Sequence, residues 1–146
     1  MRALIQRASY GAVRIENKLA GEIQKGLVIL LGVHTNDQAD DARYLAAKCV
    51  NLRIFPDDNG NMNKSLLETN GEALIVSQFT LYGDTRKGRR PSFIQAAPPD
   101  ISKPLYQQFV HNVKLAGISV ATGQFGAMMA VEIHNDGPVT LMLESR

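Results

Sequence analysis

The chain has 146 residues, of which 45% are hydrophobic, and a formal net charge of +2. This length and apolar content suit one core, so we expect a single domain over residues 1–146. The small net charge excludes a protein that coats nucleic acid with its whole surface. Any RNA contact must therefore come from local clusters of the 16 Lys and Arg residues.

Cysteine content and the N-terminal residues limit the chemistry and the cellular location expected of the protein. Cys49 is the one cysteine, which excludes an intrachain disulfide and a cysteine metal cluster. The first residues show no signal-peptide pattern, and the longest apolar run, 27–33, is too short for a membrane-spanning helix. We expect a cytoplasmic protein with no membrane role.

The first half of the chain predicts short strands and one helix from the spacing of its apolar residues. The expected strands are 2–8, 12–15, 19–23, 27–33 and 52–55, with 27–33 buried on both faces and with turns at 16–18 and 56–60. Asn36 or Asp37 is expected to cap a helix that ends near Asn51. Its buried positions would be Leu45, Cys49 and Val50, and its solvent-facing ones Asp40, Asp41, Arg43 and Lys48.

The second half predicts a strand at 72–79 and an irregular loop from Thr80 to Pro99, followed by a helix that starts at Ser102 and Pro104 and ends at Gly117. Leu105, Phe109 and Val113 would form the buried stripe of this helix. Strands at 118–122, 128–133 and 139–143 complete the set. The expected fold is a single α/β domain with a mostly antiparallel sheet or barrel-like β core and about two main helices.

A polar cluster ends the 72–79 strand. Ser77, Gln78 and Thr80 bring three hydrogen-bonding side chains to a place where main-chain N–H groups can also point outward. Such groups could hold a developing oxyanion. The alternative is a strand that simply becomes polar as it reaches solvent. No histidine is adjacent in sequence to act as a base, so Thr80 alone is a weak candidate nucleophile.

Two further features each have a structural and a functional interpretation. Gly137-Pro138 lies among turn-forming residues, which predicts an ordinary tight turn before the last strand. Arg86, Lys87, Arg89 and Arg90 place four positive charges within five positions, either as solvated surface charge or as a mobile arm that contacts RNA phosphates. The three histidines lack suitably spaced partner ligands, so we assign no metal, and no cofactor is expected.

Three ordered motifs carry a family resemblance, namely SQFTLYGD at 77–84, GRRPSF at 88–93 and NDGPVT at 135–140. The N-terminal MRALIQRAS and the 51–63 stretch fit the same pattern. Together they resemble the D-aminoacyl-tRNA deacylases, the D-tyrosyl-tRNA deacylase family, over essentially the whole chain.

The resemblance implies a homodimeric enzyme that hydrolyses the ester joining a D-amino acid, or glycine mischarged on tRNA-Ala, to the terminal adenosine of tRNA. It implies that the Gly137-Pro138 peptide is cis and reaches the partner subunit's site, where main-chain oxygens reject L-amino acids. It also implies that Arg7 holds this turn and that Phe125 and Met129 line the aminoacyl or adenosine pocket. Ser77, Gln78, Phe79 and Thr80 would form the catalytic segment, and Arg86, Lys87, Arg89 and Arg90 would contact tRNA.

Alternatives stay open for the mechanism and for the function. The Thr80 hydroxyl could attack the ester, or the N–H groups around Phe79 and Thr80 could stabilise the oxyanion while water attacks with help from the substrate's ribose hydroxyl. We favour the second, because no base accompanies Thr80. The competing function classes are a non-catalytic RNA-binding dimer and an esterase for small esters.

Overall fold

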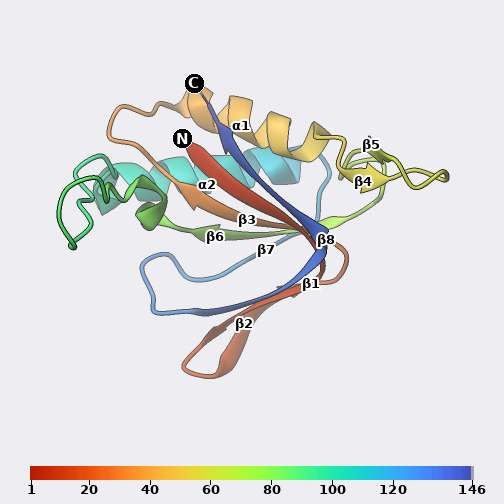
Figure 1. The fold of residues 1–146 in the computed structure, drawn as a ribbon, viewed down its shortest axis with the longest axis horizontal. Helices are drawn as coiled ribbons and strands as arrows, with labels where there is room; N and C mark the ends of the chain where they lie inside the picture. Colours follow the sequence, from red (N-terminus) through yellow and green to blue (C-terminus); the bar gives the residue numbers. More distant parts are fainter. Residues whose placement is uncertain (146) are drawn as a thin grey trace.

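A strongly curved mixed sheet organises the chain. In the computed structural model, which describes residues 1–145, six strands form this sheet, and two short strands form a separate pair (Figure 1). The strands of the main sheet are β1 (Arg2–Ile15), β2 (Lys18–Ile23), β3 (Gly26–Gly32), β6 (Glu72–Ser77), β7 (Val120–Thr122) and β8 (Ala130–Glu144). The remaining elements are α1 (Ala39–Asn51), β4 (Phe55–Pro56), β5 (Met62–Lys64), the 3₁₀ helix η1 (Phe79–Tyr82) and α2 (Pro99–Leu115).

The pairing of the strands gives the sheet its barrel-like form. β1 pairs antiparallel with β2, β3 and β8, whereas β3, β6 and β7 are parallel to one another. The free edges of β2 and β7 approach so closely that a Cβ on Gly21 would lie 2.7 Å from the main-chain oxygen of Thr122. The predicted barrel-like core with two main helices is therefore confirmed, and its sheet is mixed.

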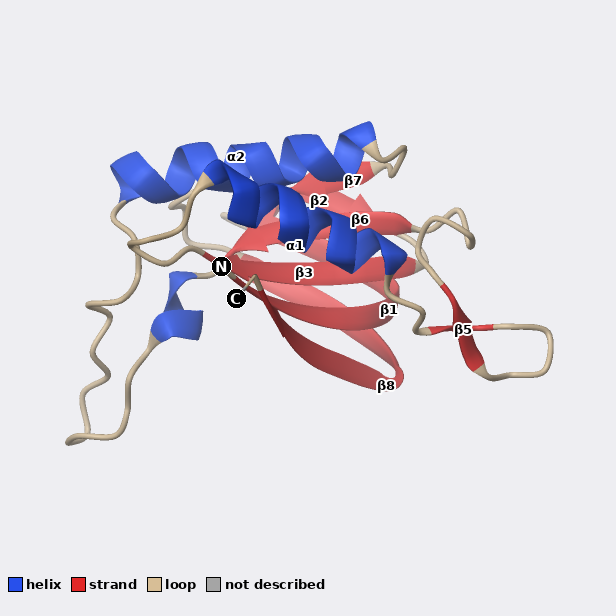
Figure 2. Ribbon diagram, turned by 90° about the horizontal axis from the view of Figure 1, so that it is seen from above, coloured by secondary structure: helices blue, strands red, loops and turns tan. Residues whose placement is uncertain are grey.

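Two hydrophobic clusters stabilise the fold, one on each face of the sheet. The helices α1 and α2 lie side by side over one face (Figure 2). Between these helices and the sheet lie Leu27, Ile29 and Leu31 of β3, while Val28 of the same strand packs in the second cluster inside the curve. The prediction that this strand is buried on both faces is confirmed, and burial of apolar surface on this scale is the main stabilising term.

Several predicted boundaries were wrong because local turn signals did not break the sheet. The expected strands at 2–8 and 12–15 are one strand, β1, and those at 128–133 and 139–143 are one strand, β8. The expected strand at 52–55 is limited to Phe55 and Pro56 of β4, and β5 was not foreseen. At the end of β6 the chain turns into η1 at Phe79, where a continuing strand was expected.

The helix starts also differ from the predictions. The predicted caps, Asn36 and Asp37, were wrong, because Gln38 caps helix α1 and its N–H donates to the Asp41 carboxylate at 2.9 Å. Asp41 was expected to face water but is buried. Helix α2 begins three residues before Ser102, with Pro99 in its first turn and Pro104 inside it. Its buried stripe consists of Ser102, Tyr106, Phe109 and Val113, while Leu105 is only partly buried. The helix ends before Gly117 as expected; this glycine has φ +91°.

Candidate active site

A largely apolar pocket of about 610 Å³ opens at the Ser77 end of the barrel. Ser77, Gln78 and Phe79 form one side, at the junction of β6 and η1. Phe125 and Met129 come from the segment between β7 and β8, Phe93 comes from the segment that leads into α2, and Ser102 lies in the first turn of α2. The structure thus brings together five of the predicted site residues: Ser77, Gln78, Phe79, Phe125 and Met129.

The change from strand to 3₁₀ helix frees two main-chain donors beside this pocket. The Gln78 N–H still pairs with the Leu31 oxygen at 2.8 Å, and the N–H groups of Leu81 and Gly83 donate to Gln78 and Thr80 oxygens. The N–H groups of Phe79 and Thr80, at the first turn of η1, have no acceptor among residues 1–145. Paired main-chain N–H groups beside a pocket are the arrangement that stabilises an oxyanion.

No ionisable side chain lines the pocket within the described part of the chain. His34 packs against the Tyr82 ring outside it, His111 lies on α2, and His134 pairs with Glu132 at 2.9 Å on β8. Cys49 lies on the buried face of α1, and this burial raises the pKa of its thiol to about 12. A side-chain acid, base or thiolate is therefore not available to the pocket, and its polar chemistry rests on main-chain groups, hydroxyls and one amide.

The Thr80 hydroxyl contacts the Gln78 side chain and has no hydrogen bond to a base among residues 1–145. Its oxygen accepts a hydrogen bond from the Gln78 side-chain amide, which cannot take up a proton as a histidine would. Neutral hydroxyls without a base are poor nucleophiles. The hydrogen bond between Gln78 and Thr80 therefore orients the two side chains without activating the hydroxyl as a nucleophile.

Tyr106 contacts β6 and Phe125 next to the pocket, and it was not singled out from the sequence. Its hydroxyl donates to the Ile75 main-chain oxygen at 2.8 Å, two residues before Ser77, and its ring packs against Phe125 with centroids 5.7 Å apart. Burial raises the pKa of Tyr106 to about 12, so its hydroxyl remains a hydrogen-bond donor at neutral pH. The signal in the sequence was the spacing of Ser102, Tyr106, Phe109 and Val113 along one helix face.

Gly137 and Pro138 lie in β8 beside Arg7 of β1, toward the other end of the sheet from this pocket. Their peptide bond is cis, and they do not form the expected turn but a bulge within β8, where four residues, 136–139, oppose Arg7 alone. Arg7 Nε lies 3.2 Å from the Asp136 main-chain oxygen and 3.1 Å from its carboxylate, and Nη1 donates to the Ile54 oxygen at 2.6 Å. Arg7 therefore ties the bulge to the segment before β4.

Gly137 and the pocket do not meet within one chain. Arg7 pairs with Leu27 on β3, whereas Ser77 pairs with Leu31, four residues further along that strand. At about 3.3 Å per residue, this offset alone separates the two regions by roughly 13 Å along the strands. The two segments could form one site only across an interface between two chains.

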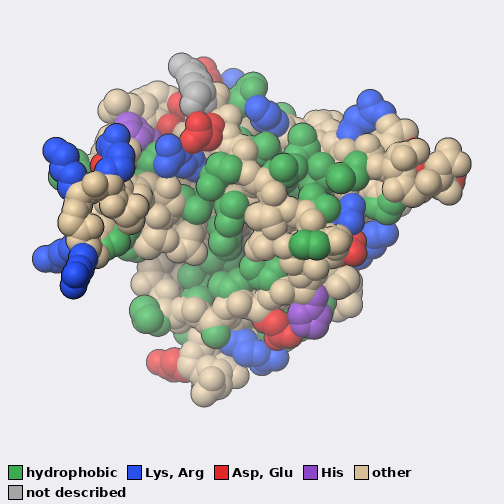
Figure 3. Space-filling model, viewed as in Figure 1, with side chains coloured by type: hydrophobic (Ala, Val, Ile, Leu, Met, Phe, Trp, Pro, Cys, Tyr) green, Lys and Arg blue, Asp and Glu red, His purple; other side chains and the backbone are tan. Residues whose placement is uncertain are grey.

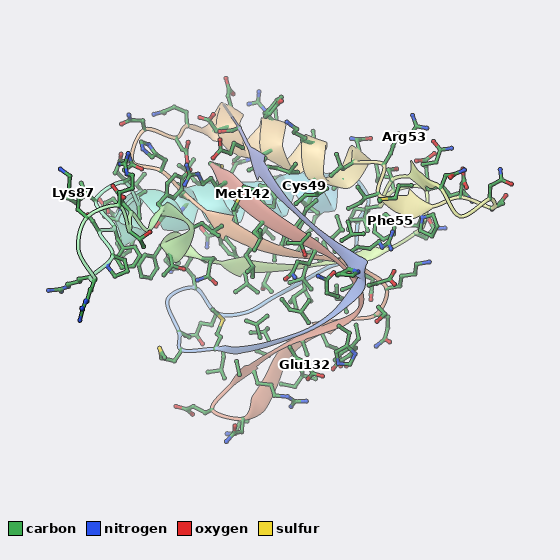
Figure 4. The ribbon with its side chains drawn as sticks, viewed as in Figure 1. Cys49, Arg53, Phe55, Lys87, Glu132 and Met142 are labelled. Atoms are coloured by element: carbon green, nitrogen blue, oxygen red, sulfur yellow. The ribbon has the colours of Figure 1, made fainter. Side chains whose placement is uncertain are left out.

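The four basic residues lie on the basic loop, residues 84–92, which projects from the body of the protein, with Lys87 near its tip (Figure 4). Main-chain hydrogen bonds of 2.8 and 2.9 Å between Asp84 and Ser92 close its base. Hydrogen bonds from Arg86 to Asp84 hold the pKa of this carboxyl at about 2. Lys87, Arg89 and Arg90 have no ion-pair partner among the residues described.

The pocket has an apolar lining without an ionisable side chain, and its wall includes Phe79 but not Thr80, the next residue in sequence. The main-chain N–H groups of both residues have no acceptor among residues 1–145, and main-chain donors of this kind can stabilise an oxyanion. Comparison with known proteins assigns the family. The sequence model of the family described as D-Tyr-tRNA(Tyr) deacylase matches residues 4–144. The chain therefore belongs to that family, and the family and the deacylase class expected from the sequence are confirmed.

Curated relatives match the chain from end to end. A protein of Thermosipho africanus (strain TCF52B) named D-aminoacyl-tRNA deacylase is 58% identical, with 100% of this chain and 98% of that protein covered. A protein of Desulfatibacillum aliphaticivorans with the same name is 57% identical, and both chains are covered completely.

Solved structures share the fold. One titled c-Myc DNA Unwinding Element Binding Protein has a TM-score of 0.94 and 35% identity, covering 100% of this chain and 99% of its own. Another, of a probable eukaryotic D-amino acid tRNA deacylase, has a TM-score of 0.85 and 22% identity, with 98% of each chain covered. At that identity the second likeness shows the fold alone.

Proposed function

We propose that this protein hydrolyses the ester between a D-amino acid and the terminal adenosine of tRNA. The observation that carries the proposal is the pair of unpartnered N–H groups at Phe79 and Thr80 beside a pocket without ionisable side chains. They would stabilise the tetrahedral oxyanion while water attacks, assisted by the substrate's own ribose hydroxyl. Ser77 and Gln78 would position the ester, with Phe125 and Met129 lining the pocket for the aminoacyl or adenosine group.

Rejection of L-amino acids is proposed to come from main-chain oxygens of Gly137 and Pro138 of a second subunit. Each factor of ten in discrimination requires about 1.4 kcal/mol, so a margin of about 10³ requires roughly 4 kcal/mol. A rigid main-chain group near Cα can supply this while accepting many side chains. Glycine has no Cβ to be rejected, which supports activity toward glycyl-tRNA mischarged on tRNA-Ala.

A homodimer is supported by the exposed surface of β8. Its outer edge has no partner strand among residues 1–145, and long unpaired edges favour pairing with another chain. Cross-strand pairing places Met142, Leu4, Leu30 and Val76 in one row across the sheet, from this edge to the pocket. Hydrophobic side chains gather in the middle of this face (Figure 3). A second copy seated on this row would lie beside the pocket and could bring its own Gly137 to it.

The cellular setting follows from the proposed substrate. No helix within residues 1–145 is long and apolar enough to cross a membrane. Aminoacyl-tRNA is used in translation, so we propose that the protein acts in the cytoplasm, with the basic loop contacting the tRNA.

Parallel incubation of the full-length protein with D-tyrosyl-tRNA and L-tyrosyl-tRNA tests the proposal. We expect release of tyrosine from the D form and not from the L form. Binding without release from either would support the alternative, a non-catalytic RNA-binding dimer. Equal release from both, together with hydrolysis of a simple nitrophenyl ester, would support a general esterase.

A further inference from the structure

An exposed apolar surface lies between the pocket and the basic loop, and the proposed hydrolysis does not use it. Phe93 is 37% exposed and Ile94 is 86% exposed. The Phe93 ring packs edge-on against Phe79, with centroids 5.1 Å apart, and also lines the pocket. Phe79 begins η1, so Phe93 is one side chain away from the N–H groups proposed to hold the ester.

The backbone holds Phe93 and Ile94 at the surface from both sides. On one side, Ser92 pairs with Asp84. On the other, the Gln95 oxygen accepts from the Thr35 N–H at 3.1 Å, and the Ala97 N–H donates to the Val33 oxygen at 2.9 Å. The exposure of these two side chains is therefore fixed by the fold and is not a feature of a loose loop.

A glycine allows the Phe93 ring to lie against the main chain. A Cβ on Gly83 would approach Phe93 Cε1 to 3.1 Å and the Thr80 oxygen to 3.0 Å, which is tighter than ordinary contact. Gly83 thus lets the ring pack close to η1. A flat aromatic ring held in this way and partly open to solvent is suited to stacking with a nucleobase.

Charge decides which partner fits this surface. Lys87, Arg89 and Arg90, without ion-pair partners among the residues described, lie on the basic loop, which ends next to Phe93. Basic groups beside an exposed aromatic ring are the combination that binds single-stranded nucleic acid. A second copy meeting the same surface across a two-fold axis would bring the two sets of cations together, which disfavours that occupant.

We propose that Phe93, with Ile94 beside it, is a stacking platform for the nucleotide that precedes the terminal adenosine of the substrate RNA. The single-stranded 3′ end would then run from the pocket, over Phe93, toward the cations of the basic loop. This inference rests on the proposed function. Phe93 acts as a positioning residue, because it holds the RNA and does not touch the ester.

Two small substrates distinguish the contribution of the proposed platform to catalysis from that of the pocket. One is 3′-D-tyrosyl-adenosine, and the other is the D-tyrosyl ester of the dinucleotide cytidylyl-adenosine, which adds only the preceding nucleotide. We expect the wild-type protein to have a higher kcat/KM on the dinucleotide ester. Phe93→Ala is expected to remove about fivefold or more of that advantage, mainly through KM, while the adenosine ester is affected far less.

Three further variants control the experiment. Phe93→Leu keeps an apolar contact with Phe79 but lacks a flat ring, so it should lose the dinucleotide advantage even if Phe93→Ala unfolds. Phe93→Trp should retain the advantage. Tyr44→Ala is the matched control, because Tyr44 is an exposed aromatic residue beside Lys48 on α1; it should change neither substrate.

Several outcomes would overturn the platform. An equal loss on both esters would place the Phe93 contact within the pocket, and an unchanged dinucleotide advantage would exclude stacking. Dissociation of a dimer by Phe93→Leu, measured by sedimentation, would identify the surface as a subunit interface. Failure of the wild-type protein to release D-tyrosine from any substrate would instead refute the proposed function, on which the platform depends.

Discussion

The Thr80 hydroxyl accepts a hydrogen bond from the Gln78 amide, and the main-chain N–H groups of Phe79 and Thr80 have no acceptor among residues 1–145. In the proposed reaction, the main chain supplies the oxyanion contacts, and the hydroxyl only helps to position the substrate. Loss of one neutral hydrogen bond costs about 0.5–1.5 kcal/mol, which is roughly a 2- to 12-fold change in rate.

Thr80→Ala should therefore retain activity within about tenfold of the wild type. Single-turnover hydrolysis of D-tyrosyl-tRNA measures this, and Thr85→Ala, an exposed threonine on the basic loop, is the matched control. A loss of about 10³-fold or more with an unchanged melting temperature would identify Thr80 as the nucleophile.

Gly137 has φ +122°, and a Cβ at this position would lie 2.9 Å from both Arg7 Nη2 and Val139 Cγ2. Gly137→Ala should therefore cost about 1–3 kcal/mol in the free energy of unfolding, because the backbone is strained and the Arg7 contact must shift. It should also lower the ratio of D to L hydrolysis, since the displaced carbonyl groups would no longer lie where the proposed rejection of L-amino acids requires them.

The control for Gly137 is Gly117→Ala at the end of α2. Gly117 also has a positive φ, +91°, but a Cβ there would meet nothing within 4 Å. It should reproduce the backbone strain without moving Arg7, so its ratio of D to L hydrolysis should equal that of the wild type. An unchanged ratio in Gly137→Ala would contradict the proposed rejection of L-amino acids.

Among the elements, the sequence predicted several features that depend on local pattern, although the starts of α1 and α2 were predicted wrongly. The apolar run of β3 and the α2 stop before Gly117 are local signals, and both were predicted correctly. The η1 turn at Phe79 was not, because its residues also fit a strand and tertiary packing decided between the two. Gly137 and Pro138 looked like a turn, since the pairing of β8 with β1 on both sides of them is a long-range contact.

The residues of the candidate site also divide into those that a local sequence pattern predicted and those that it did not. Ser77, Gln78 and Phe79 were found through their position at a strand end, whereas Phe125 and Met129 were found only through the family resemblance, because no local pattern distinguishes them from core residues. Tyr106 was missed since its role depends on α2 crossing β6 at Ile75, a contact between residues 31 positions apart.

The basic loop gives a prediction about salt dependence. Arg86 is already paired with Asp84, so Arg89 and Arg90 are the better candidates for phosphate contacts. Arg89→Ala combined with Arg90→Ala should reduce the slope of log Kd for tRNA against log salt by about one to two units, because each phosphate contact contributes about 0.7–0.9. Filter binding between 50 and 200 mM salt, as a rough range, measures the slope.

Arg43→Ala combined with Lys48→Ala, on the exposed side of α1, removes the same charge elsewhere and controls for net charge. Its slope should match the wild type. If both double variants flatten the slope equally, the loop acts only through the total charge of the protein.

At the scale of the whole molecule, the two halves of the proposed site lie at opposite ends of one sheet, so discrimination depends on assembly. Met142 is 47% exposed at the free edge of β8 and belongs to the apolar row that leads to the pocket. Met142→Lys would place a charge in the middle of the proposed interface, and a buried unpaired charge there is strongly unfavourable. We expect this variant to sediment as a monomer.

In the monomer, the ratio of D to L hydrolysis should fall more than the rate of hydrolysis of the D ester. The pocket and its N–H groups belong to one chain, whereas in the proposed arrangement Gly137 comes from the other. We therefore expect the ratio of D to L hydrolysis by Met142→Lys to fall at least about tenfold, or about 1.4 kcal/mol. Leu115→Lys is the control, since Leu115 is 72% exposed at the end of α2, outside the apolar row. A monomeric Met142→Lys that still rejects L-tyrosyl-tRNA as the wild type does would show that each chain enforces handedness alone, against the arrangement proposed for Gly137.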